Sequence, residues 1–195
     1  MSAAERDQAL AEIAFCEAVL AKGGLNILSE TFGGVTSIAA WDHYPPGDVF
    51  DPASNAQWYY HCHPAGEESL EHGHFHCFLR PDGPQGPIHH LMAVGVDASG
   101  RLLRLFTVNQ WVVGDDWIDA DEAIALLSRF DMQMPRPSYL VNRWLTAIFV
   151  AYEAEMVALL HERDRRLAVS KPLDGTPVRE DRSLEVLSEF VVSRA

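Results

Sequence analysis

The segment EHGHFHCF, residues 71–78, restricts the fold more than any other segment, because histidines recur at every second position. Side chains at positions i and i+2 of a strand lie on the same face. If the segment is a strand, His72, His74 and His76 therefore share one face, and Phe75 and Cys77 point to the other. We expect the apolar face to pack on helices and the imidazole face to line a cleft.

A second segment with the same character lies just upstream. In QWYYHCH, residues 57–63, alternation places Tyr59, His61 and His63 together and Trp58 on the opposite face. If the two segments pair as a hairpin across residues 64–71, their histidine faces coincide, because paired strands share a surface. This pairing predicts up to four imidazoles within reach of one ion.

Neutral imidazole nitrogen is a ligand for zinc, iron and copper. An H-x-H pair on a strand offers two ligands from a rigid element, so His74 and His76 are the first predicted pair, followed by His61 and His63. The possible additional ligands are His72, His89 and His90. Because His89 and His90 are adjacent and point to opposite faces, we expect at most one of those two to join.

The histidines could also serve roles that need no metal ion. They could be hydrogen-bonded structural side chains, pH sensors, or the lining of a pocket that binds an anion or haem. Clustered imidazolium charges repel one another and an ion relieves the repulsion, which favours a divalent transition metal, Fe, Zn or Cu. Cys62 and Cys77 fall on the apolar faces, as small core residues, which argues against a structural zinc knot. Glu71 could be a ligand, an acid or base, or a hydrophilic turn residue; its position in the alternation differs from that of the histidines, which favours the turn residue.

The loop WDHYPPGDVFD, residues 41–51, is the second candidate region. Its polar residues Asp42, His43 and Tyr44 are tentative catalytic residues, either orienting a ligand imidazole or acting as acid or base beside the metal. A rigid turn with Asx caps accounts for the same composition.

The rest of the chain predicts an α+β protein with a small, mostly antiparallel sheet. Residues 3–22 form an amphipathic helix that ends at Gly23-Gly24, and residues 33–56 form a loop region after a short extended piece. The segments 90–97 and 101–109 form strands joined by a DASG turn. Asp119 and Glu122 form a capping box, Ser138 caps one long helix to about residue 167, and residues 183–192 form a last short helix.

These elements predict a single domain over residues 1–195. Its histidine-rich sheet core spans about residues 35–113 and its helical part about residues 119–195.

Charge and composition narrow the function classes. A net charge of −13 opposes binding to a nucleic-acid backbone, so we expect no nucleic acid. The partner that we expect is a small-molecule substrate, which would react at the open position of the predicted metal site. No apolar run approaches the ~20 residues of a membrane helix, and the N-terminal segment lacks a basic region of the secretory type. Three cysteines are too few for a disulfide framework. We therefore expect a cytoplasmic protein without membrane partners; the sequence does not indicate its oligomeric state.

Several segments resemble an uncharacterised bacterial family known as a domain of unknown function. They include WDHYPPGDVFD, EHGHFHCFLRP and RPSYLVNRWLTA, and together they span about residues 41–147. The resemblance implies no activity and carries over no catalytic residues. Locally, the HFH of residues 74–76 is similar to the metal-binding strands of α-class carbonic anhydrases and cupins. The glutamate that the cupin pattern places soon after the pair is absent here.

The sequence thus predicts a metalloenzyme acting on a small molecule at a mononuclear, multi-histidine site. Aromatic residues around the histidines suit a dry, apolar pocket and equally suit a core. We place an oxidoreductase or oxygenase with non-haem iron or copper first. A zinc-dependent hydrolase or lyase is the close alternative, and a non-catalytic metal- or haem-binding protein is the third.

Overall fold

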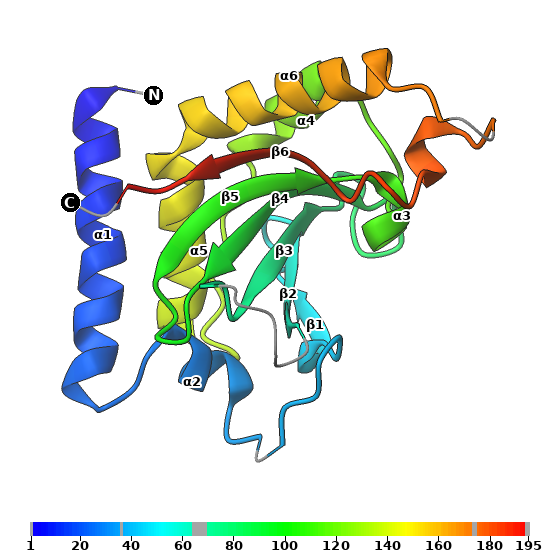
Figure 1. The fold of residues 1–195 in the computed structure, drawn as a ribbon. Coiled ribbons are helices and arrows are strands. Elements are labelled where there is room, and N and C mark those ends of the chain that lie inside the picture. The colour runs from blue at the N-terminus through cyan, green and yellow to red at the C-terminus, as the bar shows by residue number, and fades with distance from the viewer. Residues whose placement is uncertain (1, 36, 64–69, 173–174, 194–195) are drawn as a thin grey trace.

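Six antiparallel strands form one sheet in the order of the chain (Figure 1). The computed structural model describes residues 2–35, 37–63, 70–172 and 175–193. The strands are β1 (Tyr44–Phe50), β2 (Ala56–Cys62), β3 (Gly73–Leu79), β4 (His89–Val96), β5 (Leu102–Val108) and β6 (Val186–Val191). Hairpin connections join β1 to β5 in sequence, whereas β6 returns from the C-terminal part to pair with β5.

Register gives the sheet two chemically different faces. His61 pairs with His74 across β2 and β3, and His74 pairs with Gly95 of β4, which in turn pairs with Arg104 of β5. Directly paired residues share a face, so these side chains lie on one side, here called the histidine face. The opposite side, the helix face, carries the alternate residues, such as Phe75, and is covered by helices.

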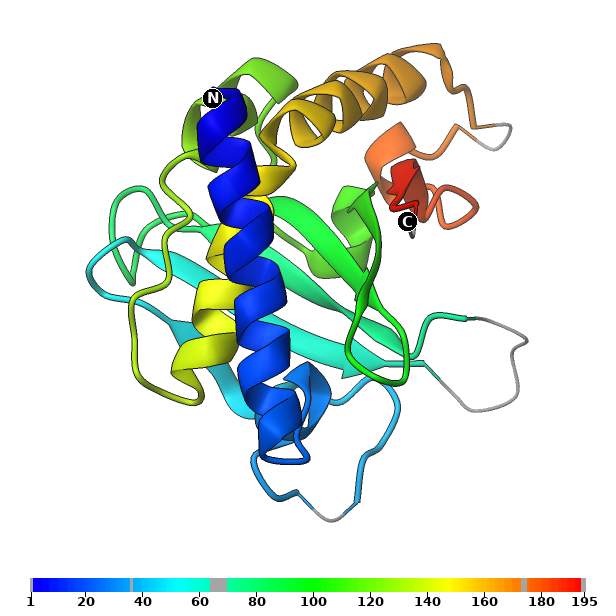
Figure 2. The same ribbon diagram turned by 90° about the vertical axis from the view of Figure 1, so that its left-hand side faces the viewer.

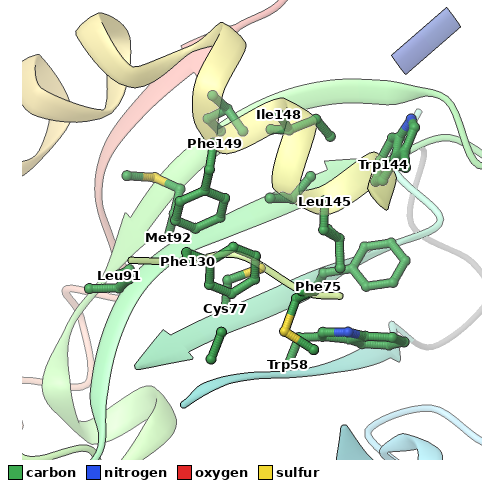
Figure 3. Close-up of a cluster of buried hydrophobic side chains, with 14 of the residues drawn as sticks. Trp58, Phe75, Cys77, Leu91, Met92, Phe130, Trp144, Leu145, Ile148 and Phe149 are labelled. Carbon is green, nitrogen blue, oxygen red and sulfur yellow. The ribbon is translucent and has the colours of Figure 1, made fainter. Parts of the chain in front are cut away.

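The main hydrophobic core fills the helix face. Figure 3 shows Trp144, Leu145 and Ile148 of α5 (Tyr139–Ala151) lying over the strands. Trp144 packs against Phe75 with 5.9 Å between ring centroids, and Phe75 packs edge-on against Trp58 at 5.4 Å. These rings are fully buried. The alternation seen in the sequence therefore places the aromatic side chains in the core and leaves the histidines on the other face.

The helices form layers outside the sheet. Helix α1 (Ala3–Lys22) packs on the outer side of α5 (Figure 2), and α6 (Glu153–Val169) covers β5 and β6. Helix α4 (Ala120–Leu127) packs on α6, and its capping box of Asp119 and Glu122 forms as predicted. The short elements are α2 (Ile27–Phe32), α3 (Gln110–Val113) and a 3₁₀ turn (Val178–Glu180). The protein is α+β, with an N-terminal helix and C-terminal helices on one antiparallel sheet.

Among the described residues, no single helix has the length and apolarity to cross a bilayer; α5 and α6 meet such a test only as a pair, bent by 73°.

Four predictions of secondary structure differ from the structure, and three of them concern β1 and the helices α5 and α6. Residues 44–50, predicted as loop, form β1, whose edge position tolerates its two prolines. The predicted long helix is bent into α5 and α6 at Tyr152, which lets one helix cover the sheet centre and the other its β5–β6 end. Ser138 precedes α5 without a side-chain cap.

The last element is a strand rather than the predicted helix. Leu184, Leu187 and Val191 have helix-like spacing, but residues 186–191 pair with the free edge of β5. Ser188 lies 2.6 Å from the Thr107 hydroxyl across that pair and donates to the Leu159 carbonyl of α6. Tertiary pairing therefore overrides the local spacing.

Candidate metal centre

Three histidines from two strands place their ring nitrogens close together. His61 belongs to β2, His63 is the first residue after the end of β2, and His74 belongs to β3. One ligand atom from each lies within 4.8 Å of the others, a group that could hold a metal ion. The antiparallel pairing of His61 with His74 causes this convergence, because it aligns the two strands at the histidines.

The separations of the Nε2 atoms match those around a shared ion. The Nε2 atom of His74 lies 2.9 Å from that of His61 and 3.0 Å from that of His76. Two imidazole nitrogens bound at ~2.0–2.1 Å to one ion are roughly 3.0–3.4 Å apart, depending on the coordination angle. Only small side-chain shifts would therefore convert these contacts into coordination.

Hydrogen bonds alone do not satisfy this group of nitrogens. A neutral imidazole has one N–H donor and one acceptor lone pair. Since His74 donates through Nδ1 to the Glu71 carboxylate at 2.9 Å, its Nε2 holds a single lone pair that faces both His61 and His76. Within the described part of the chain, the buried Nε2 atom of His63 has no hydrogen-bond partner. A cation would accept lone pairs from all of these nitrogens, so the donor set could hold a metal ion.

Burial keeps the cluster in the form that binds metals. Desolvation, followed by the nearby His74 and His63, lowers the pKa of His61 to about 3. Burial also lowers the pKa of His74, although Glu71 opposes the shift, and it lowers the pKa of His76 well below its ordinary value. These imidazoles are therefore neutral near pH 7, as coordination requires.

A β-bulge adds His90 to the histidine face. His90 pairs with Phe78 while Met92 pairs with Cys77, so the register shifts by one residue at Leu91. The shift turns His90 toward His76, whose Nδ1 lies 3.0 Å from the Nε2 of His90. Burial lowers the pKa of His90 to about 3. His89 points to the other face, where its Nδ1 donates to the Asp116 carbonyl at 2.5 Å, so of the two it is His90 that lies on the histidine face.

His72 leaves the histidine face although its parity matches that of His74. The strand begins only at Gly73, and His72 turns toward the helix face, where its Nδ1 lies 2.6 Å from the Tyr60 hydroxyl. Its ring also packs near Phe32 of α2. The structure therefore separates His72 from the three-histidine group.

Aromatic side chains form the rim of the centre. The Trp41 indole lies over His63 with 5.0 Å between centroids and meets His61 edge-on at 5.5 Å. Trp41 has a φ of 71°, a conformation that bulky residues rarely adopt, and its backbone N–H donates to the Cys62 carbonyl. Phe106 meets the His74 ring edge-on at 4.9 Å.

The three tentative catalytic residues of the loop have different positions. His43 stacks on Tyr59 at 3.6 Å, and its Nδ1 lies 2.9 Å from a carboxylate oxygen of Asp48. The centroid of the Tyr59 ring lies 5.1 Å from that of His76, so His43 adjoins the cluster through Tyr59. Tyr44 is buried, and its hydroxyl accepts from the Ala39 N–H. Asp42 is exposed.

Glu71 is buried in the site, so the favoured prediction of a hydrophilic turn residue was wrong. Its side chain is only 6% exposed and binds both His74 and Arg104. Burial alone would raise its pKa, but the hydrogen bonds from His74 and Arg104 outweigh burial and hold the pKa at about 2. The parity argument failed because residue 71 lies before the strand. Gly95 lies in the middle of an apolar strand, and a glycine there could have indicated that another side chain packs closely against the strand backbone.

Comparison with known proteins gives a family without a function. A family model described as a domain of unknown function, DUF6969, matches residues 7–192. The chain belongs to this family. No curated protein and no solved structure matches the chain. The family description gives no activity, so the function of this chain is argued from its histidine centre.

Proposed function

We propose that the histidine face binds one divalent transition-metal ion through His61, His63 and His74, with His76 as the further ligand. We propose also that this ion catalyses a reaction of a small molecule. The observation that carries the proposal is the convergence of imidazole nitrogens from His61, His63 and His74, which hydrogen bonds among the described residues leave incompletely satisfied. A fully hydrogen-bonded structural cluster would not leave the Nε2 of His63 buried and, among the residues that the structure describes, unpaired.

Within this proposal, redox chemistry with non-haem iron or copper comes first. All proposed ligands are neutral nitrogen donors, which suit these ions, and the rim is aromatic. The packing of the rings favours a bare ion over haem, since His61 and His74 meet edge-to-face at 4.5 Å and a macrocycle needs a flat slot beside its ligand.

A zinc hydrolase or lyase is the second candidate, and the His43–Asp48 pair favours it. Bound zinc would supply a water of lowered pKa. Asp48 accepts from Gln57 through its other oxygen at 2.9 Å, so the carboxylate is fixed and can hold His43 as a proton acceptor. The His43 side chain is 45% exposed, which leaves it open to a substrate from solvent.

Metal binding is tested first on protein produced without a histidine tag. We would measure bound metal by elemental analysis and titrate Zn²⁺, Fe²⁺ and Co²⁺ against a chelator, using the Co²⁺ absorption as a report on the ligands. His74→Ala should abolish stoichiometric binding. The matched control is His72→Ala, two positions away on the helix face, which should bind as the wild type does.

Three results would contradict the proposal or one of its parts. Absence of stoichiometric binding by the wild type, or equal binding by His74→Ala, would exclude the metal site. Nitric oxide added anaerobically to the Fe²⁺ protein should give a characteristic EPR signal if a coordination position is open. A saturated site without that signal would instead identify a protein that binds metal without catalysis.

A further inference from the structure

A buried carboxylate connects the proposed centre to the far strands of the sheet. One oxygen of Glu71 accepts from Nδ1 of His74 at 2.9 Å, and the other accepts from Nε of Arg104 at 2.5 Å. Arg104 also donates through Nη1 to Glu189 of β6 at 2.9 Å, and its guanidinium lies 4.1 Å from the centre of the Phe106 ring. The carboxylate is therefore held by groups from β3 and β5.

The space for this carboxylate exists because residue 95 is a glycine. A Cβ atom at Gly95 would lie 2.3 Å from the Glu71 oxygen that binds Arg104 and 3.0 Å from Cγ of Arg104. Gly95 sits in β4 between His74 and Arg104, the residues with which it pairs. Even the smallest side chain would thus displace Glu71 from its position over the strand.

The contact with Glu71 decides which nitrogen of His74 is free. An ionised carboxylate only accepts hydrogen bonds, so the proton of the neutral imidazole resides on Nδ1. Nε2 then presents its lone pair toward His61 and His76. Metal-bound histidines commonly donate their other nitrogen to a carboxylate in this way, which fixes the tautomer and the ring orientation.

We infer that Glu71, held by Arg104 in the space above Gly95, is the positioning residue that makes His74 an Nε2 ligand. The inference rests on the metal site proposed above. A purely structural ion pair between Glu71 and Arg104 is the competing hypothesis, and it would affect the stability of the fold without changing the metal affinity of the folded protein.

The test compares Glu71→Gln and Gly95→Ala with a matched control, Glu189→Gln. The control removes the exposed carboxylate partner of the same Arg104 without touching His74. We expect both test variants to bind Zn²⁺ and Co²⁺ roughly 10–100-fold more weakly than the wild type. The control should stay within about threefold of the wild type, because its carboxylate has no contact with a ligand in the described structure. Circular dichroism verifies that each variant is folded.

A second readout is the tautomer of His74 in the metal-free protein, measured by ¹⁵N NMR of labelled histidine side chains. The wild type should carry the proton on Nδ1, and Glu71→Gln should give a mixture of tautomers. Wild-type affinity in both folded test variants would overturn the inference and leave the metal site standing. If the wild type bound no metal, the proposed function would fail. A proton on Nε2 of His74 in the wild type would by itself overturn the inference. Because the wild-type spectrum reports the tautomer of His74 directly, it tests the inference even if both variants fail to fold.

Discussion

Replacing His63 by leucine should stabilise the metal-free protein and remove its response to metal. The Nε2 atom of His63 is buried and, among the described residues, unpaired, so the metal-free fold carries the cost of desolvating a polar atom. Leucine has no polar atom and fills much of the same volume under Trp41. A substitution that is harmful to function is thus expected to favour folding, as is common where a site is built for a ligand.

The size of the effect follows from two opposing terms. A buried unsatisfied polar atom costs about 1–3 kcal/mol. Loss of the ring contact with Trp41, at 5.0 Å between centroids, removes about 0.5–1.5 kcal/mol. The net gain is therefore about 1 kcal/mol, which for a chain of 195 residues raises Tm by roughly 2–4 °C.

Thermal unfolding followed by circular dichroism, with chelator and then with metal, measures both effects. At a free metal concentration about 100 times Kd, binding stabilises the wild type by about 2.7 kcal/mol, or roughly 5–11 °C in Tm. His63→Leu should lose most of this increase. The matched control is His161→Leu on the exposed surface of α6, which should keep the full response to metal.

The reasoning would be refuted by a variant that is less stable than the wild type in chelator. Such a result would mean that His63 makes a favourable interaction in the metal-free protein. A metal response equal to that of the wild type would separately show that His63 is no ligand.

Two further predictions concern the core beneath the site. Asn142 of α5 accepts a hydrogen bond from the Trp58 indole and donates one to the Met134 carbonyl. Asn142→Ala should therefore lower the free energy of unfolding by about 3 kcal/mol, measured by urea denaturation. A loss below about 1 kcal/mol would contradict this account. Burial raises the pKa of Cys16 to about 11 and that of Cys77 well above its usual value, so both are protonated thiols at pH 8 and should react with a thiol reagent only on unfolding. Rapid modification of either thiol in the folded protein, located by peptide mapping, would be inconsistent with the buried positions.

Local patterns correctly indicated the elements whose signals lie within a few residues. The capping box of Asp119 and Glu122 forms, and the glycines after residue 22 end α1. The alternation in residues 57–63 and 74–79 also holds, because a strand inside a sheet keeps a period of two wherever the pairing is regular. Alternation together with hairpin pairing was sufficient to bring His61 next to His74.

Parity failed where the backbone departs from a regular strand. His90 joins the histidine face because a bulge at Leu91 shifts the register, and no local pattern indicates such a shift. His72 and Glu71 precede the first residue of β3, so strand alternation does not set their directions, and each points toward its partner, Tyr60 or Arg104.

The sequence by itself determined that an imidazole-bearing strand face would exist and that its reverse side would be apolar. Only the tertiary structure decided which imidazoles meet, which carboxylate supports them, and that residues 186–191 complete the sheet as a strand. The reason is physical: side-chain alternation is a property of one strand, whereas coordination geometry and edge pairing depend on contacts between segments far apart in the chain.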